Sequence, residues 1–267
     1  TDIWYPTTQN VKPQISDQLA VGWGFQLSKD LLLTNEFYYK WLDNQIDFKD
    51  FAELFANDDL EEEFAFGRGY AYGMELGVEK TEGRFTGWLG YTLAFIRRGE
   101  FTSLDGEQID GGAFFPPRYD RRHDLSLVGM YELNPKLTFS AAFVYGSGDI
   151  SWLPTGRFFF QDSPGRFPFP AVPDYPERNN FRLPPYHRLD LSLVIRFDPK
   201  WGESDLTIGI YNALNRRNPY FVYIEPEVEE VQPINGEGDP FEVLTGVAAR
   251  QVSLFPIIPS LTYNFKF

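Results

Sequence analysis

The sequence has no cysteine and only two histidines among its 267 residues. Without cysteine, disulfide bonds and metal sites built on thiolates are excluded. No apolar run approaches the roughly 20 residues that a membrane-spanning helix requires. Basic residues are also scarce, because 24 Lys and Arg stand against 38 Asp and Glu, for a net charge of −14. This balance argues against a nucleic-acid partner, since a phosphate-binding surface needs clustered Lys and Arg.

The motifs of common enzymes and metal sites are missing as well. The sequence contains no GxSxG, HExxH or Walker motif. His123 and His187 lie in two similar segments, RRHDLSLV and YHRLDLSLV, which the pattern places on strands that are not neighbours. Two histidines held apart do not make a metal site. We therefore predict no enzymatic activity, no metal and no cofactor.

The dominant feature of the sequence is a period-two alternation of apolar and polar residues. Within residues 186–198, Leu189 and Leu191 fall on one face of an extended chain, and Asp190 and Ser192 fall on the other. The same pattern recurs, and it predicts nine strands. They cover residues 17–28, 31–48, 67–80, 84–100, 120–133, 137–150, 186–198, 205–215 and 260–267.

Short and long connections alternate strictly between these strands. The short ones are residues 28–30, 81–83, 134–136 and 198–204. The long ones are residues 49–66, 101–119, 151–185 and 224–250. In an up-and-down antiparallel sheet, this order gathers all short turns at one end and all long loops at the other. Outer-membrane barrels have this layout, with short periplasmic turns and long extracellular loops.

Three features favour lipid over a protein core as the environment of the apolar face. The predicted strands run to about 12–17 residues, whereas strands of soluble sheets average about 5–6. Aromatic residues such as Trp23 and Trp41 lie near strand ends, as in an interfacial girdle. No segment could form a helix that covers a sheet face. We predict an all-β fold, an antiparallel up-and-down transmembrane β-barrel; a soluble β-rich binding module is the alternative.

The last strand, SLTYNFKF, keeps its apolar face to the final residue of the chain. Nine strands do not close a bacterial barrel, whose strand number is even and whose sheet leaves no free edge in lipid. We therefore interpret residues 1–267 as the C-terminal portion of a larger barrel. On this interpretation the terminal strand faces lipid and closes against a first strand that lies in other sequence.

Four stretches of the sequence, taken in order, contain KPQISDQLAVGWG and YYKWLDNQIDF (within 11–48), RRHDLSLVGMYELNPK (within 118–149), IGIYNALNRRNPY (208–220, following the strand at 186–197) and FPIIPSLTYNFKF (255–267). Together they resemble the C-terminal β-barrel of TonB-dependent outer-membrane receptors, especially the Bacteroidetes-like type. The ordered set covers nearly all of the chain. The resemblance implies a barrel of about 22 strands, filled by an N-terminal plug domain that residues 1–267 do not contain, as they also lack the early strands.

The resemblance also implies a function and a set of partners. Such receptors lie in the bacterial outer membrane and take up scarce ligands, such as siderophores, cobalamin or glycans, with energy relayed by TonB. The implied partners are the lipid bilayer and lipopolysaccharide, the rest of the barrel with its plug, the TonB system and the barrel-assembly machinery. A passive porin, or a structural barrel within a surface assembly, is the alternative. The resemblance further implies that Tyr263, Phe265 and Phe267 form the signal that the assembly machinery reads.

The long loop at 151–186 is the strongest candidate for ligand contact. It combines many prolines with aromatic and arginine side chains, which can hold a ligand by stacking and charge. The candidate residues are Trp152, Arg157, Phe159, Arg166, Tyr175 and Arg178. The same residues could instead pack the loop over the barrel rim. The acidic runs at 57–63 and 225–242 are interpreted as solvated loops, with cation capture as the alternative.

Overall fold

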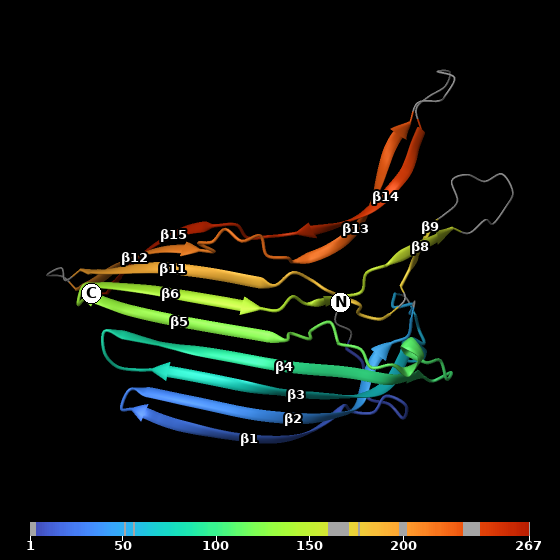
Figure 1. The fold of residues 1–267 in the computed structure, drawn as a ribbon, viewed down its shortest axis with the longest axis horizontal. Helices are drawn as coiled ribbons and strands as arrows, with labels where there is room; N and C mark the ends of the chain where they lie inside the picture. Colours follow the sequence, from blue (N-terminus) through green and yellow to red (C-terminus); the bar gives the residue numbers. More distant parts are fainter. Residues whose placement is uncertain are drawn as a thin grey trace.

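In the computed structural model of the protein, nine strands form a single antiparallel sheet (Figure 1). The described residues are 4–50, 52–55, 57–159, 171–175, 177–197, 202–231 and 241–266. The sheet order is β1-β2-β3-β4-β5-β6-β11-β12-β15. Its strands are β1 (Ile15–Ser28), β2 (Leu31–Phe48), β3 (Phe64–Lys80), β4 (Phe85–Ser103), β5 (His123–Asn134), β6 (Leu137–Gly146), β11 (Tyr186–Phe197), β12 (Glu203–Tyr211) and β15 (Ile258–Lys266). The prediction of nine strands is confirmed.

The connections divide between the two ends of the sheet as the sequence predicts. The turns that join β1 to β2, β3 to β4 and β5 to β6 lie at one end (Figure 1), where Phe197 at the end of β11 also pairs with Ser204 of β12. Lys266 at the end of β15 pairs with Glu203 at the start of β12, so the chain finishes at this same end. The long connections lie at the opposite end, which is called the long-loop end below.

Three small sheets and two short helices lie within the long connections. The paired strands are β7 (Ile150–Ser151) with β10 (Phe181–Arg182), β8 (Gly156–Phe159) with β9 (Ala171–Asp174), and β13 (Phe221–Val231) with β14 (Phe241–Val252). The 3-10 helices are η1 (Leu60–Glu63) and η2 (Ile109–Gly112). The β13–β14 hairpin differs from the sequence prediction, which treats 224–250 as a loop. No helix among the described residues is long and apolar enough to cross a membrane.

The two faces of the sheet differ in chemistry along whole rows of paired residues. Directly paired residues on neighbouring strands lie on the same face. One row is entirely apolar: Phe25, Leu33, Val78, Leu89, Leu127, Phe143 and Leu189. The next row, on the opposite face, is small or polar apart from one valine: Gly24, Thr34, Gly77, Gly90, Ser126, Val144 and Arg188. The apolar face is called the outer face and the other the inner face.

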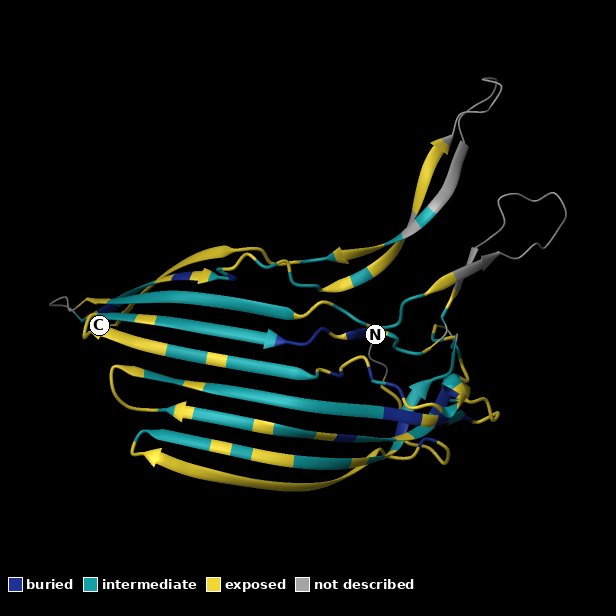
Figure 2. Ribbon diagram, viewed as in Figure 1, coloured by how far each residue is buried: buried dark blue, intermediate teal, exposed yellow. Residues whose placement is uncertain are grey.

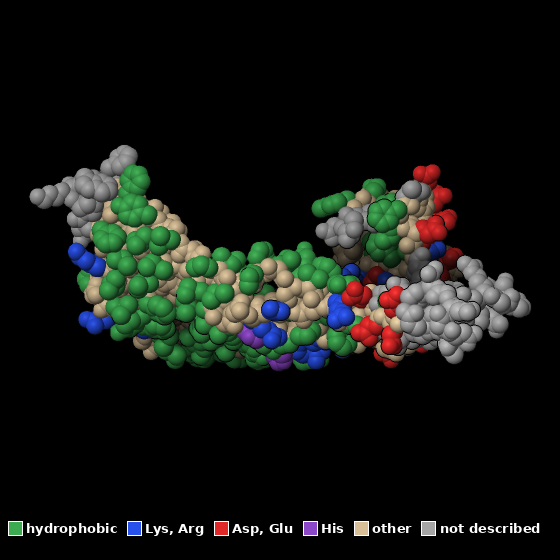
Figure 3. All heavy atoms as spheres, turned by 90° about the horizontal axis from the view of Figure 1, so that it is seen from above, with side chains coloured by type: hydrophobic (Ala, Val, Ile, Leu, Met, Phe, Trp, Pro, Cys, Tyr) green, Lys and Arg blue, Asp and Glu red, His purple; other side chains and the backbone are tan. Residues whose placement is uncertain are grey.

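Burial is slight over most of the sheet and greatest at the long-loop end. Every residue of β1 and β15 is exposed, and both strands appear in yellow in Figure 2. Ala65, Phe101, Ile109 and Phe115 form a small buried core where β3 and β4 meet η2. Figure 3 shows hydrophobic side chains gathered on one side of the sheet and acidic ones at the long-loop end. Among the described residues, therefore, no layer covers the apolar outer face.

Candidate ligand-binding site at the long-loop end

Arg178, in the long connection between β6 and β11, is tied to the end of β2. Its guanidinium donates hydrogen bonds to Asp50 Oδ1 at 2.6 Å, Asp47 Oδ1 at 2.9 Å and the carbonyl oxygen of Phe48 at 2.9 Å. Asp47 also forms an ion pair with Arg98, with 3.5 Å between Asp47 Oδ2 and Arg98 Nη1. Two carboxylates and a carbonyl therefore occupy the donors of Arg178, which fixes the base of this connection to the sheet.

Trp152 and Tyr175 form an aromatic pair beside this anchor. Their ring centroids lie 4.8 Å apart with the planes tilted by 50°. The guanidinium of Arg178 lies 5.4 Å from the Trp152 ring, within the range of a cation–π contact. The side chain of Asn180 closes the segment from the other side, since it donates to the Leu153 carbonyl at 2.8 Å and accepts from the Leu153 amide at 3.1 Å. The indole nitrogen of Trp152 is buried and has no hydrogen-bond partner among the described residues.

A second arginine lies on the same leg of the connection, four residues after Arg178. Arg182 pairs with the carboxylate of Asp120, a side chain that is fully buried, and donates to the Gly148 carbonyl at 2.8 Å. The Arg182 backbone pairs with Ile150 in the short β7–β10 sheet. Arg178 and Arg182 both lie on the returning leg of the connection: Arg178 ties this leg to β2, and Arg182 ties it to the outgoing leg at Gly148 and Ile150.

The structure places the predicted ligand-contact residues in different situations. It brings Trp152, Tyr175 and Arg178 together. Arg157 and Phe159 lie on β8, at the far end of the connection, and their side chains are outside the described part of the structure. Arg166 lies outside the described residues.

The predicted assembly residues lie on β15. Tyr263 and Phe265 pair with Leu206 and Ser204 of β12 and stack on each other at 6.2 Å. Both are exposed on the outer face. Phe267 lies outside the described residues.

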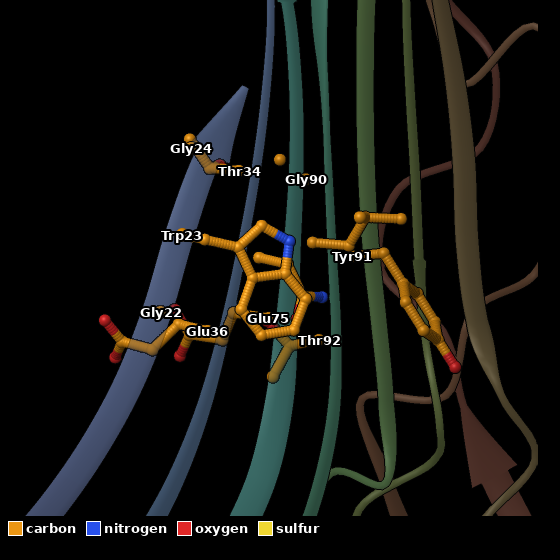
Figure 4. A pocket seen from close by; sticks show the side chains of 12 residues that line it. Gly22, Trp23, Gly24, Thr34, Glu36, Glu75, Gly90, Tyr91 and Thr92 are labelled. Atoms are coloured by element: carbon orange, nitrogen blue, oxygen red, sulfur yellow. The ribbon is translucent and has the colours of Figure 1, made fainter.

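The inner face carries a cavity that the sequence only hinted at. Glu36, Glu75 and Thr92 are paired across β2, β3 and β4, and they line a cavity of about 660 Å³ (Figure 4). Four glycines from three strands make up much of the remaining lining: Gly22 and Gly24 of β1, Gly77 of β3 and Gly90 of β4. A side chain at Gly77 would place its Cβ 2.4 Å from Thr34 Oγ1. The signal in the sequence was the placement of glycine on alternate, inner-face positions.

A polar network occupies the inner face of β11 and β12. Arg188 donates from Nε to Asp190 Oδ2 at 2.9 Å, and from Nη1 to the hydroxyls of Tyr186 at 3.0 Å and Tyr211 at 3.1 Å. The guanidinium also lies 4.6 Å from the centroid of the Tyr211 ring. The guanidinium of Arg188 and the carboxylate of Asp190 are hydrogen-bonded to each other, so the network stiffens the inner face and offers no free acid–base pair.

The asparagines of YNALNRRNPY have a structural role that sequence reasoning missed. Asn212 is buried with φ of 53°, and its side chain donates to the carbonyls of Arg216 at 2.9 Å and Phe255 at 3.0 Å. Asn218 brackets the backbone of His187, accepting from its amide at 3.0 Å and donating to its carbonyl at 2.9 Å. Asparagine suits these positions because it tolerates the left-handed region and can donate and accept at once.

The segment that precedes β1 also docks at the long-loop end. Glu61 of η1 accepts hydrogen bonds from Asn10 Nδ2 at 2.6 Å, Thr8 Oγ1 at 2.9 Å and the Tyr5 hydroxyl at 3.2 Å. The hydrogen bond from Asn10, with help from the other two, holds the pKa of Glu61 below its ordinary value. The charged form of Glu61 therefore holds the segment in place.

The two histidines lie on strands that do not touch. β6 separates β5, which carries His123, from β11, which carries His187. His123 instead contacts Tyr91, whose hydroxyl lies 2.8 Å from His123 Nδ1. Across the described part of the chain, no three His, Asp or Glu side chains are grouped so that they could hold a metal ion.

Comparison with known proteins places the chain in a family. The family model described as TonB dependent receptor-like, beta-barrel, matches residues 2–213. Among solved structures, the closed form of the ferric-catecholate import receptor Fiu from E. coli K12 is similar, with 19% identity and a TM-score of 0.48. The match covers 79% of this chain and 25% of that receptor, so the chain spans about a quarter of the receptor's length. A search of curated proteins found no match. Since the family model covers well over half of the residues, the chain belongs to the TonB-dependent receptor β-barrel family.

Proposed function

We propose that this chain is the C-terminal part of an outer-membrane barrel that takes up a scarce ligand with energy relayed by TonB. Barrels of this family lie in the bacterial outer membrane. The observation that carries the proposal is the division of one continuous sheet into an apolar outer face and a polar, glycine-rich inner face. Such a sheet can face lipid on one side and a filled lumen on the other.

Further strands complete the barrel in this proposal. β1 and β15 are both edges of the sheet, and an edge within lipid would leave backbone N–H and C=O groups without partners. Strands elsewhere in the same protein therefore pair with β1 and β15. A plug domain fills the lumen, and the inner-face glycines of β1, β3 and β4 leave room for it.

The long loops face the cell exterior and the short turns face the periplasm. This orientation follows the usual arrangement of outer-membrane barrels, in which the long connections are extracellular. It puts the acidic long-loop end, with its anchored aromatic pair, where an external ligand arrives. The C-terminal end of β15 then lies on the periplasmic side, where the exposed Tyr263 and Phe265, with Phe267, act as the signal for barrel assembly.

The connection between β6 and β11 forms the ligand site. Trp152 and Tyr175 offer aromatic surface at its base, Arg157 and Phe159 lie on β8, and Arg166 lies in the sequence between β8 and β9. Arg178 contributes mainly as a positioning residue, because its donors are occupied by Asp47 and Asp50. The ligand class is a siderophore, cobalamin or a glycan.

Energy dependence separates this function from that of a passive porin or a structural barrel. We expect uptake of a siderophore, cobalamin or oligosaccharide panel by cells that express the protein to stop when the TonB system is deleted. Uptake that persists without TonB, together with open-channel conductance in planar bilayers, would indicate the porin. Trp152→Ala combined with Tyr175→Ala should weaken binding of the transported ligand, while the inner-face variant Ser126→Ala should leave it unchanged.

A further inference from the structure

Three cavities follow one another across the sheet at the long-loop end. The first, of about 450 Å³, lies over β1 to β4 and is lined by Tyr38 and Lys40 among others. The second, of about 550 Å³, lies between the β4–β5 connection, the β6–β11 connection and the start of β13. The third, of about 260 Å³, lies between the ends of β11 and β12 and the segment before β15. Tyr119 and Arg121 line both the first and the second, and Tyr220 lines both the second and the third, so the three are called the rim groove below.

Tyrosine rings are spaced along the rim groove. Tyr38 is on the inner face, because it continues the alternation of Thr34 along β2. Tyr119 and Tyr220, at the two junctions between cavities, are exposed over 63% and 65% of their surfaces. Tyr211 lines the third cavity. Aromatic rings at successive points suit a ligand that is built of repeated ring-shaped units, each with a face that can stack.

Two cations of the rim groove have no carboxylate partner in the described part of the protein. Lys40, in the first cavity, has its Nζ 5.2 Å from the centroid of the Tyr38 ring and forms no ion pair with a described residue. Arg118, in the second cavity, is exposed, and its side chain has no hydrogen bond or ion pair among the described residues. Its backbone is fixed, since its carbonyl oxygen accepts a hydrogen bond of 3.0 Å from the Ile150 amide.

The carboxylates that line the rim groove are already paired. Asp149 Oδ1 lies 3.3 Å from Arg121 Nη2, and the buried Asp120 pairs with Arg182. The charge left over in the groove is therefore positive, and it lies on both sides of Tyr119. The acidic groups elsewhere at this end are screened over roughly 8 Å at physiological ionic strength, so the contacts within the groove decide which charge it accepts.

Shape and charge together select the class of ligand. Successive cavities suit an elongated ligand, whereas a compact chelate would occupy one of them. Sugar rings stack on aromatic side chains through their C–H faces, and carboxylate or sulfate groups on the sugar pair with Lys and Arg through charge-assisted hydrogen bonds. A neutral oligosaccharide would leave both free cations without a partner.

We propose that the rim groove binds an acidic oligosaccharide. Its sugar rings stack on Tyr119 and Tyr220, and its carboxylate or sulfate groups pair with Lys40 and Arg118. The inference rests on the proposed function and names the ligand class within it. The rim groove also continues the aromatic site of the β6–β11 connection toward the inner face, because Ser151, which precedes Trp152, lines the second cavity.

The test measures binding to the intact protein purified from outer membranes in a mild detergent, by isothermal titration calorimetry. The probes are oligogalacturonate and oligomannuronate, which carry carboxylates, and heparin fragments, which also carry sulfates. Methyl-esterified oligogalacturonate is the neutral counterpart. We expect at least one acidic probe to bind, and the neutral ester to bind about tenfold or more weakly than oligogalacturonate when the groove prefers carboxylate. Preference for heparin fragments instead assigns sulfate as the acid group.

Substitution of the two free cations tests the site itself. Lys40→Gln and Arg118→Gln should each weaken binding of the acidic probe about tenfold, because each removes one charge-assisted contact. Lys29→Gln and Arg84→Gln are the matched controls, since they remove the same charges from the β1–β2 and β3–β4 turns at the opposite end of the sheet. Lys40→Arg and Arg118→Lys keep the charge and should retain most of the affinity, which separates loss of contact from misfolding.

The stacking contact has its own pair of variants. Tyr119→Ala should weaken binding of the acidic probe about tenfold, whereas Tyr119→Phe keeps the ring and should bind nearly as the wild type does. Equal affinities of these two variants would show that no sugar ring stacks on Tyr119.

Several outcomes overturn the proposal. They are binding of no acidic probe, equal affinity for the acidic and neutral forms, and unchanged affinity in the double variant Lys40→Gln, Arg118→Gln. Tighter binding of a compact ferric tricatecholate, lost in the same double variant, assigns the cations to a siderophore. A fall in thermal stability of that variant without a change in affinity assigns them to contacts with the plug.

Uptake measured in parallel separates this inference from the proposed function. Binding of the acidic probe to the purified protein, with uptake that persists after deletion of the TonB system, overturns energised transport and leaves the rim groove as the site. TonB-dependent uptake of another ligand, with no binding of any acidic probe, overturns the rim groove alone.

Discussion

Arg178 Nη2 donates a hydrogen bond of 2.9 Å to Oδ1 of Asp47, a residue 131 positions earlier in the chain. The contact joins the connection between β6 and β11 to the end of β2, four strands away in the sheet. Both side chains are largely buried, with 13% and 19% of their surfaces exposed. A candidate ligand loop is thereby fixed at its base by an ion pair that is shielded from solvent.

Removing this ion pair should destabilise the protein. Arg178→Gln leaves Asp47 and Asp50 buried with less compensation, and we expect the free energy of unfolding to fall by about 3 kcal/mol. Urea unfolding followed by tryptophan fluorescence measures this. Arg250→Gln is the matched control, because its pair with Glu225 is about half exposed and should be worth less than about 1 kcal/mol. Equal effects of the two changes would contradict the anchoring role of Arg178.

Neighbouring residues of β11 should respond oppositely to a charge. Leu191 pairs with Ala141 and Ile210 on the outer face, and Ser192 pairs with Ser140 and Gly209 on the inner face. Leu191→Arg should cost about 2–4 kcal/mol if it lies at the bilayer midplane, whereas Ser192→Arg should fold far more readily. Heat-modifiable migration on gels reports folding of both variants. Equal damage would mean that the two faces are wrongly assigned.

Gly148 should not tolerate even a methyl group. A Cβ at this position would lie 1.8 Å from the Leu183 carbonyl oxygen, so the two legs of the connection would have to separate. We expect Gly148→Ala to cost about 1–3 kcal/mol and to speed cleavage of the connection by added protease. Gly24→Ala is the control, since its nearest neighbour lies at 3.8 Å. Similar protease resistance of the wild type and Gly148→Ala would contradict the close approach.

Docking of the segment before β1 should depend on pH through Glu61. The pKa of Glu61 in the folded protein is lowered from 4.5, first by the hydrogen bond from Asn10. A lowered pKa means that the contribution to stability is present above pH 4.5 and is lost as the pH falls through the folded-state value. The protection factors of the amides of residues 8–11, which are corrected for the intrinsic pH dependence of exchange, should therefore decrease on acidification below pH 4.5. Glu61→Gln should already exchange faster at pH 7 and should show little of this pH dependence.

The alternation of the strands could be predicted because every strand pairs one uncovered apolar face with a polar one. β2 ends at Phe48 as expected, and β11 covers nearly the whole predicted segment. The β13–β14 hairpin could not be predicted, because Pro226 and the glutamates around it have the composition of a solvated loop. The strand character of β13 comes from its pairing with β14, in which Glu225 lies opposite Ala248. No local pattern in the sequence reveals this pairing.

The site was only partly accessible from the sequence. The composition of the loop drew attention to Trp152, Tyr175 and Arg178, which do lie together. The hydrogen bond from Arg178 to Asp47 could not be predicted from the sequence. The two residues lie far apart in the chain, and only the folding of the sheet brings them together. The anchoring of Asn212 was hidden for the same reason, since one of its acceptors, Phe255, follows a whole hairpin later.

The direct pairing of Gly146 with Tyr186 has a consequence for how receptors of this kind can diversify. Paired residues of an antiparallel ladder have Cα atoms about 5 Å apart, so the ladder fixes both ends of the connection whatever its length or composition. Doubling such a loop costs only about 0.6 kcal/mol in closure entropy. The part of the connection between its anchored residues Gly148 and Arg178 can therefore change in length or composition while the register of the sheet remains the same.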